Sequence, residues 1–190
     1  MVLGEYMLLN RLARRVPVAL LLATAAAGTA NAATQGSLGT TSTGSVVINA
    51  SVAGRVQISG LRDVTFADVD AGVAQSDAQD VCVWSNTNGR KYNIKASGSG
   101  SGGAFTLASG ALDPVNYTVE WNALAGKATG TGLVNGTGLA GQASVATAPT
   151  CASGPTKSAS LIVKMDTTNL QNMQAGATYS GTLTLVVAPE

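Results

Sequence analysis

The sequence predicts an all-β protein, built as an antiparallel β-sandwich or barrel. In many short segments apolar and polar residues alternate with the period of two that a half-buried strand requires. Clusters of Gly, Ser, Asn and Asp separate these segments at nearly regular intervals, as turns do. Beyond the N-terminal region no segment has a convincing apolar stripe at helical spacing, and Thr, Ser and Gly supply the polar faces.

Residues 1–32 have the composition of a secretory signal peptide. Three arginines precede an apolar run at 16–27, which is short for a membrane-spanning helix. Ala30 and Ala32 place small side chains at the two positions that a signal peptidase recognises. We therefore expect cleavage after Ala32, and the alternative is an N-terminal membrane anchor.

The exported chain is expected to begin with an extension at 33–52, followed by one domain at 53–190. Residues 33–44 are small and polar, which predicts a flexible lead-in because they cannot bury enough apolar area to become ordered. Residues 45–52 then alternate, which predicts a strand. Its two faces are formed by Val46, Ile48, Ala50 and Val52 on one side, and by Val47, Asn49 and Ser51 on the other.

A second short strand is predicted at 55–59, ending before Gly60. Further alternating segments are expected at 63–66, 81–85, 91–96, 104–108, 117–122, 159–165 and 178–187. Asn88-Gly89 favours a tight hairpin turn between the strands at 81–85 and 91–96. The Gly-, Ala- and Thr-rich stretch 124–150 permits no strand assignment, and 166–174 fits either a helical turn capped by Asp166 or a loop.

The strand predicted at 178–187 has the clearest pattern in the chain. Leu183, Leu185 and Val187 alternate with Thr182, Thr184 and Val186, so the three apolar residues are expected to face a core. Pro189 lacks the N–H group that a ladder needs, and we expect the strand to end there.

Two cysteines, Cys82 and Cys151, are predicted to form a disulfide, because exported proteins with two cysteines usually pair them. The bridge closes a loop of about 70 residues, which the chain-entropy model values at about 4 kcal/mol. Trp84 lies two residues from Cys82, so a regular strand puts both on one face. We expect this tryptophan to pack against the disulfide.

The composition argues against several classes of function. The chain has no histidine, which excludes Ser-His-Asp and Cys-His catalysis, and we expect no catalytic residue, metal ion or cofactor. Removal of the predicted signal leaves a net charge of −1, so no strong field favours nucleic acid or anionic membrane. Trp121, expected near a sheet edge, and Tyr117 are weak candidates for contact with a glycan.

Several of these features together resemble the pilin subunits of bacterial chaperone–usher fimbriae, most closely the spore coat U-like subunits of the archaic chaperone–usher group. The features are the strand after a polar lead-in, the strand at 56–60, the cysteine pair, Phe105-Thr106-Leu107, and Tyr179-x-Gly181-Thr182-Leu183-Thr184-Leu185. The chain departs from the group in one respect. Its first cysteine follows the N-terminal strand by about 30 residues, whereas the group often has it sooner.

The resemblance implies an immunoglobulin-like sandwich that lacks its last strand. A periplasmic chaperone would fill the gap first, and at the outer-membrane usher the extension of the next subunit would replace it. The donor residues would be Val46, Ile48, Ala50 and Val52, and the acceptor groove would include Leu183, Leu185 and Val187. Such head-to-tail contacts do not close, so they generate a filament, here a fimbria on the bacterial surface that supports adhesion or biofilm formation.

Two alternatives remain open at the level of sequence. The strand at 45–52 could complete its own domain, which would give a self-contained secreted β-sandwich that binds a glycan or a protein. A tip adhesin is less favoured, because an adhesin normally carries an additional binding domain and this chain is short for two.

Overall fold

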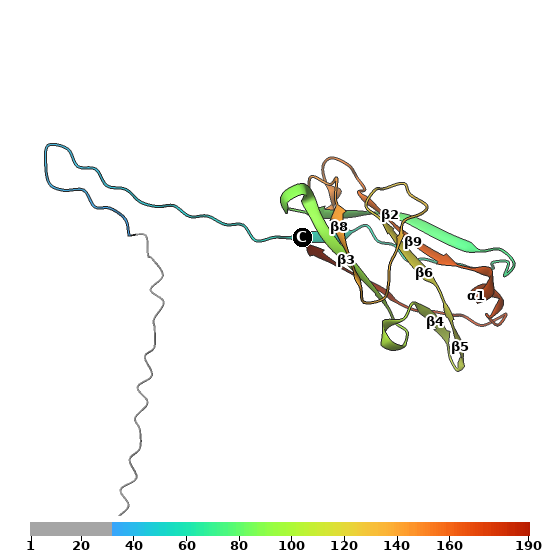
Figure 1. Cartoon of the computed structure of the whole chain (residues 1–190). Helices are drawn as coiled ribbons and strands as arrows, with labels where there is room; N and C mark the ends of the chain where they lie inside the picture. Colours follow the sequence, from blue (N-terminus) through green and yellow to red (C-terminus); the bar gives the residue numbers. More distant parts are fainter. Residues whose placement is uncertain (1–31) are drawn as a thin grey trace, which may run out of the picture. The chain divides into compact units, whose positions relative to one another are not determined.

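A computed structural model describes residues 32–190, which form an all-β chain with antiparallel sheets, consistent with a β-sandwich (Figure 1). The signal peptide predicted for 1–32 lies, apart from Ala32, outside the described residues. Chain contacts separate the residues up to Ser51 from a domain at Val52–Glu190. Within residues 32–190, no helix has the length and apolarity needed to cross a membrane.

The larger sheet has five strands in the order β1-β2-β9-β6-β7. These strands are β1 (Val56–Ser59), β2 (Gln75–Ser85), β9 (Ala159–Met165), β6 (Thr118–Asn122) and β7 (Thr131–Gly132). All the pairs are antiparallel. The central strand β9 is buried along its length except at Lys164, which is partly buried.

The smaller sheet has the order β10-β3-β8, with β10 at one edge. Its members are β3 (Lys91–Gly98), β8 (Gly138–Ala143) and β10 (Leu183–Pro189). A separate hairpin joins β4 (Thr106–Ser109) to β5 (Leu112–Asn116). One helical turn, α1 (Thr167–Gln171), follows β9, and short 3₁₀ turns occupy 88–90, 101–103 and 149–151.

Both sheets contribute to a single hydrophobic core. Its buried members include Val81 and Val83 from β2, Tyr92 and Ile94 from β3, and Trp121 from β6. The inward residues of each strand are spaced two apart, so the alternation in the sequence corresponds to the two faces of each sheet. A salt bridge from Lys164 to Glu120 joins β9 to β6.

The predicted hairpin at Asn88-Gly89 is wrong. Gly89 does make a turn, with a positive φ of 68°, but β2 and β3 belong to different sheets and do not pair with each other. A turn sequence identifies a reversal of the chain and does not identify the strand that will pair. The alternative of a capped helical turn at 166–174 is confirmed, because Asp166 accepts a hydrogen bond from the backbone N–H of Asn169 at 2.8 Å.

The predicted disulfide is confirmed. Cys82 on β2 is bonded to Cys151, which follows Thr150 in a 3₁₀ turn, with 5.9 Å between the two Cα atoms. Trp84 is partly buried and packs against the cluster formed by both cysteines and Ala146, as expected from its spacing. The bridge therefore ties the stretch before β9 to β2, next to the edge strand β1 of the larger sheet.

Replacement of both cysteines by serine should lower the free energy of unfolding by about 4 kcal/mol, because the bridge restricts the unfolded chain over a separation of 69 residues. Denaturant titration of the exported wild-type protein and the double variant would measure the difference. A reduced wild-type sample should match the double variant. Equal midpoints for oxidised and reduced protein would contradict this account.

Candidate functional site

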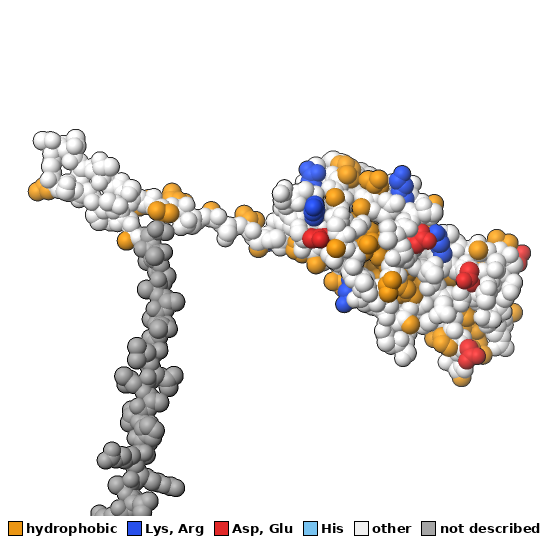
Figure 2. Space-filling view, viewed as in Figure 1, with side chains coloured by type: hydrophobic (Ala, Val, Ile, Leu, Met, Phe, Trp, Pro, Cys, Tyr) orange, Lys and Arg blue, Asp and Glu red, His pale blue; other side chains and the backbone are white. Residues whose placement is uncertain are grey.

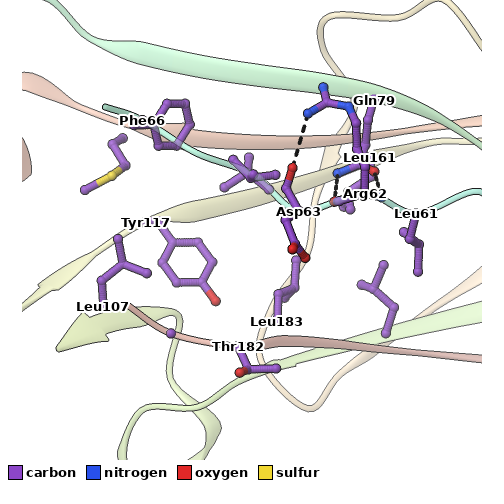
Figure 3. A pocket seen from close by; sticks show the side chains of 15 residues that line it. Leu61, Arg62, Asp63, Phe66, Gln79, Leu107, Tyr117, Leu161, Thr182 and Leu183 are labelled. Carbon is purple, nitrogen blue, oxygen red and sulfur yellow. Dashed lines mark hydrogen bonds between the residues drawn. The ribbon is translucent and has the colours of Figure 1, made fainter. Parts of the chain in front are cut away.

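A groove of about 470 Å³ lies between β10 and the segment 61–66, and it is the larger of the two described cavities (Figure 3). One wall consists of the chain from Gly181 to Leu185, and the other consists of 61–66. The floor consists mainly of core side chains from the larger sheet and the β4–β5 hairpin region, namely Leu161, Val163, Met165, Leu107 and Tyr117. The groove is therefore apolar at its base.

The first wall is an edge of the smaller sheet. β10 pairs with β3 along one side only, from Leu183 opposite Gly98 to Pro189 opposite Tyr92. No strand of the described domain is hydrogen-bonded to its other side, and such an edge is a template for pairing with another strand.

The apolar residues of β10 face inward. Leu183 and Leu185 line the groove, while Val187 packs on the core outside the groove lining. The three alternate with exposed residues, as the sequence predicted. Their role in accepting a strand stays a prediction.

Gly181 explains part of the terminal sequence signature. A Cβ at this position would lie 2.7 Å from the carbonyl oxygen of Thr106, which is too close for any other residue without backbone movement. The preceding residue, Ser180, exchanges two backbone hydrogen bonds of 2.9 Å with Ala108. The end of the groove is thus fixed to β4 before β10 begins.

The second wall was predicted as a strand at 63–66, but these residues form no regular ladder. Val64 and Phe66 are partly buried against the core, whereas Asp63 and Thr65 are exposed, so the alternation is present without a partner strand. Among the described residues, no backbone–backbone hydrogen bond involves 61–69. The groove therefore lies between the edge of β10 and a stretch of chain that no strand of the described domain pairs with.

Asp63 and Tyr117 add polar groups to the lining of this groove. Figure 3 shows the Asp63 carboxylate and the Tyr117 hydroxyl approaching Leu183 from different segments. Burial raises the pKa of the Tyr117 phenol above its ordinary value. Tyr117 is a neutral hydrogen-bonding group at neutral pH, and Asp63 is the one charged residue, besides Arg62, that lines the groove.

The predicted donor residues lie in an exposed extension. The exposed fractions are 72% for Val46, 86% for Ile48 and 87% for Val52, and Ala50 is also exposed. The extension carries no charged side chain between 33 and 54, so it appears only in white and orange in Figure 2. Exposed apolar side chains on a charge-free segment are unfavourable in water and are stabilised by burial against a partner.

The strand predicted at 45–52 does not form in the single chain. Only Ser45 takes part in a bridge, exchanging backbone hydrogen bonds of 2.8 and 2.9 Å with Thr34, and 46–52 are without regular structure. An isolated strand has no ladder to stabilise it, so the pattern of alternation shows what the segment can do beside a partner and not what it does alone.

The domain holds the root of the extension firmly. Asn86 accepts a hydrogen bond from the N–H of Arg55 at 2.6 Å and donates one to the carbonyl oxygen of Ala53 at 2.9 Å. A Cβ on Gly54 would lie 3.4 Å from Pro189, so this root is next to the C-terminal end of β10. The groove is lined by the opposite end of the same strand.

The prediction that Trp121 lies at an accessible edge is wrong. Trp121 is 1% exposed, and its indole N–H donates to the hydroxyl of Tyr92 at 3.1 Å. The two rings meet edge to face, with centroids 6.4 Å apart. Alternation placed Trp121 on the inner face of β6, where it cannot contact a glycan. Tyr117, the other predicted glycan contact, lies on the groove floor.

Sequence reasoning missed the residues of the second wall and their supports. Leu61, Phe66 and Gln79 line the groove, but none belongs to a motif that sequence alone distinguishes from core or loop. The one available signal was a polar side chain, Gln79, at an inward position of a strand. Because that strand, β2, was predicted to begin only at 81, the signal was not recognised.

A search of protein-family models finds no match to this chain, and a search of curated proteins finds none either.

The Tyr92–Trp121 pair should make stability fall at high pH. Burial raises the pKa of Tyr92 to about 12, whereas an unfolded tyrosine ionises near 10. The unfolded state therefore loses its proton first, and the free energy of unfolding should fall as the pH rises from about 10 towards 12. Denaturant titrations at pH 8, 10 and 11 would measure this fall.

The variant Tyr92→Phe should reduce the slope between pH 10 and 11, because it removes the shifted group. It should also destabilise the protein by about 1–3 kcal/mol at pH 8, since the buried indole N–H loses its acceptor. An unchanged slope would show that Tyr92 is not the titrating group.

Proposed function

We propose that this protein is a structural subunit of a surface fimbria, and that it polymerises when the segment 45–52 of one copy inserts into the groove of another. The observation that carries the proposal is the coexistence, in the same chain, of a groove with an apolar floor along the edge strand β10 and an exposed, alternating apolar segment. Each exposes apolar side chains to water when alone, and insertion of the segment into the groove would bury both sets.

Backbone chemistry supports a strand as the occupant. The β10 edge offers N–H and C=O groups on one side of the groove, and the segment 61–66 has no backbone–backbone hydrogen bond on the other. A strand lying between them can bond to both, which joins the smaller sheet to the segment that leaves β1. A small molecule would satisfy few of these groups, so strand addition is favoured.

Side-chain chemistry supports the identity of that strand. The apolar floor accepts side chains spaced two apart, and Val46, Ile48, Ala50 and Val52 have this spacing. Burial of each valine or isoleucine stabilises the joint by roughly 1.5–3 kcal/mol. The opposite face, with Asn49 and Ser51, is suited to remain in contact with water.

The contact between two copies would be head-to-tail, because the donor and the acceptor are different parts of the chain. Repetition of such a contact produces an open filament. We propose the assembly route that the resemblance implies. The subunit would be exported to the periplasm, where a chaperone would cap its immunoglobulin-like domain. It would then be transferred at an outer-membrane usher to the filament on the bacterial surface.

The variant Ile48→Asp should prevent polymerisation, because it would place a carboxylate in the apolar groove at a cost of several kcal/mol. The amount of heat-resistant multimer on denaturing gels should fall at least tenfold relative to wild type. The matched control is Val47→Asp, which puts the same charge on the other face of the same segment. This control should change the yield by less than about twofold.

A mixing experiment separates assembly between copies from completion within one copy. Leu185→Arg should block the groove but keep the donor, whereas Ile48→Asp keeps the groove and loses the donor. A mixture of the two should form dimers, and neither variant alone should do so. Stable wild-type monomers that never assemble, with 45–52 protected from proteolysis, would instead establish the self-contained secreted β-sandwich.

A further inference from the structure

The second wall of the groove is the continuation of β1 after it leaves the larger sheet. β1 and β2 pair in a regular register that ends with Ser59 opposite Cys82. Gly60 follows with a positive φ of 77°, a conformation that glycine adopts without strain. If the register continued three residues further, Arg62 would lie opposite Gln79. The ladder stops before that point.

In place of the ladder, the side chain of Gln79 bridges to the backbone of Arg62. The N–H of Arg62 donates to Oε1 of Gln79 at 2.8 Å, and Nε2 of Gln79 donates to the carbonyl oxygen of Arg62 at 3.0 Å. A glutamine amide presents one acceptor and donors, as a peptide group does. The Gln79 amide therefore replaces one pair of ladder hydrogen bonds between Arg62 and β2. Because a side chain lies between them, the two backbones are farther apart than in a ladder.

A second contact fixes the same residue. The guanidinium of Arg62 makes two hydrogen bonds to the carboxylate of Asp77, at 2.6 and 3.0 Å. Asp77 and Gln79 lie two apart on β2 and so project from the same face. Arg62 is thereby held through its main chain and its side chain together, and its guanidinium also donates to the carbonyl oxygen of Asp63 at 3.3 Å. Val64 to Phe66 keep their backbone groups available for a strand.

Gln79 is also unusual for its environment. It is only 4% exposed, and it lines the groove beside Leu161, its register partner on β9. A buried amide is stable there because both of its polar ends are bonded to Arg62. An apolar residue would pack at this position equally well, but it could not hold the wall at a fixed separation from β2.

We propose that Gln79, assisted by the Arg62–Asp77 ion pair, is the positioning residue that holds the second wall away from β2 and so sets the width of the strand-accepting groove. The part of the inference that concerns strand acceptance rests on the proposed function. The geometric part, that this amide fixes residues 61–66, is independent of the occupant.

The first experiment requires no donor strand. In full-length protein carrying Ile48→Asp, which keeps the groove accessible, Gln79→Leu should speed hydrogen exchange of the Arg62 amide at least tenfold, because among the described residues this is the one amide of 61–66 that has an acceptor. The amides of β9 should change much less. Equal exchange of the Arg62 amide with and without Gln79 would overturn the inference, whatever the function of the groove.

The matched control is Asp80→Ala, at the next position on β2. Asp80 accepts hydrogen bonds from the N–H of Gly126 and from Ser160, away from the groove, so its loss should lower stability without moving the wall. The melting temperatures of Gln79→Leu and Asp80→Ala should be measured as well, so that the two variants are compared at a similar loss of stability.

The second experiment measures binding of a fluorescent peptide with the sequence of residues 45–52. Gln79→Leu should weaken binding at least tenfold, whereas Asp80→Ala should change it by less than about twofold. Equal weakening by both variants would overturn the inference, because the effect would then follow general stability. Unchanged binding by Gln79→Leu would also overturn it. Failure of the protein with intact Gln79 to bind the peptide would overturn the proposed function, and the exchange experiment would still decide the role of Gln79.

Discussion

The constraint on which this structure depends is the need of every backbone N–H and C=O group for a partner. The backbone groups on one side of β10 are hydrogen-bonded to β3. In the chain that follows β1, the backbone of Arg62 is hydrogen-bonded to the side-chain amide of Gln79. The remaining backbone groups along the groove must form hydrogen bonds with water or with another strand. The core beneath is already complete, with Tyr92, Ile94 and Trp121 buried, so the sandwich can be ordered while its edge is still able to pair.

The sequence predicted the parts of the fold that alternation determines. β9 was predicted at its observed bounds, and the inward face of β10 follows directly from Leu183, Leu185 and Val187. The disulfide was predictable because two cysteines allow one pairing. Pairing between strands was not predictable, because hydrogen bonds between distant segments leave no local pattern. This is why Gly89 turned the chain as expected, yet did so between two sheets.

The candidate site was predictable on one side only. The predicted donor residues and the β10 wall have a period of two, which is visible without a structure. The other wall depends on Gly60, Arg62 and Gln79 acting across the register of two strands. The same limit explains the wrong prediction for Trp121. Its aromatic ring suggested an exposed glycan contact, but its position on β6 buries it in the core. A residue type indicates what chemistry is available, and the neighbouring strands decide whether it is accessible.

The absence of charge in residues 33–54 has a consequence for the environment in which such a joint could work. Ion pairs at an exposed interface weaken as salt rises, because mobile ions screen them over about a Debye length. A joint whose inserted strand contributes only apolar side chains and backbone hydrogen bonds has no ion pair from that strand to lose. Screening by salt would therefore remove nothing that the inserted strand contributes, so a filament built on this joint would not come apart for that reason when a cell passes from fresh water to brine.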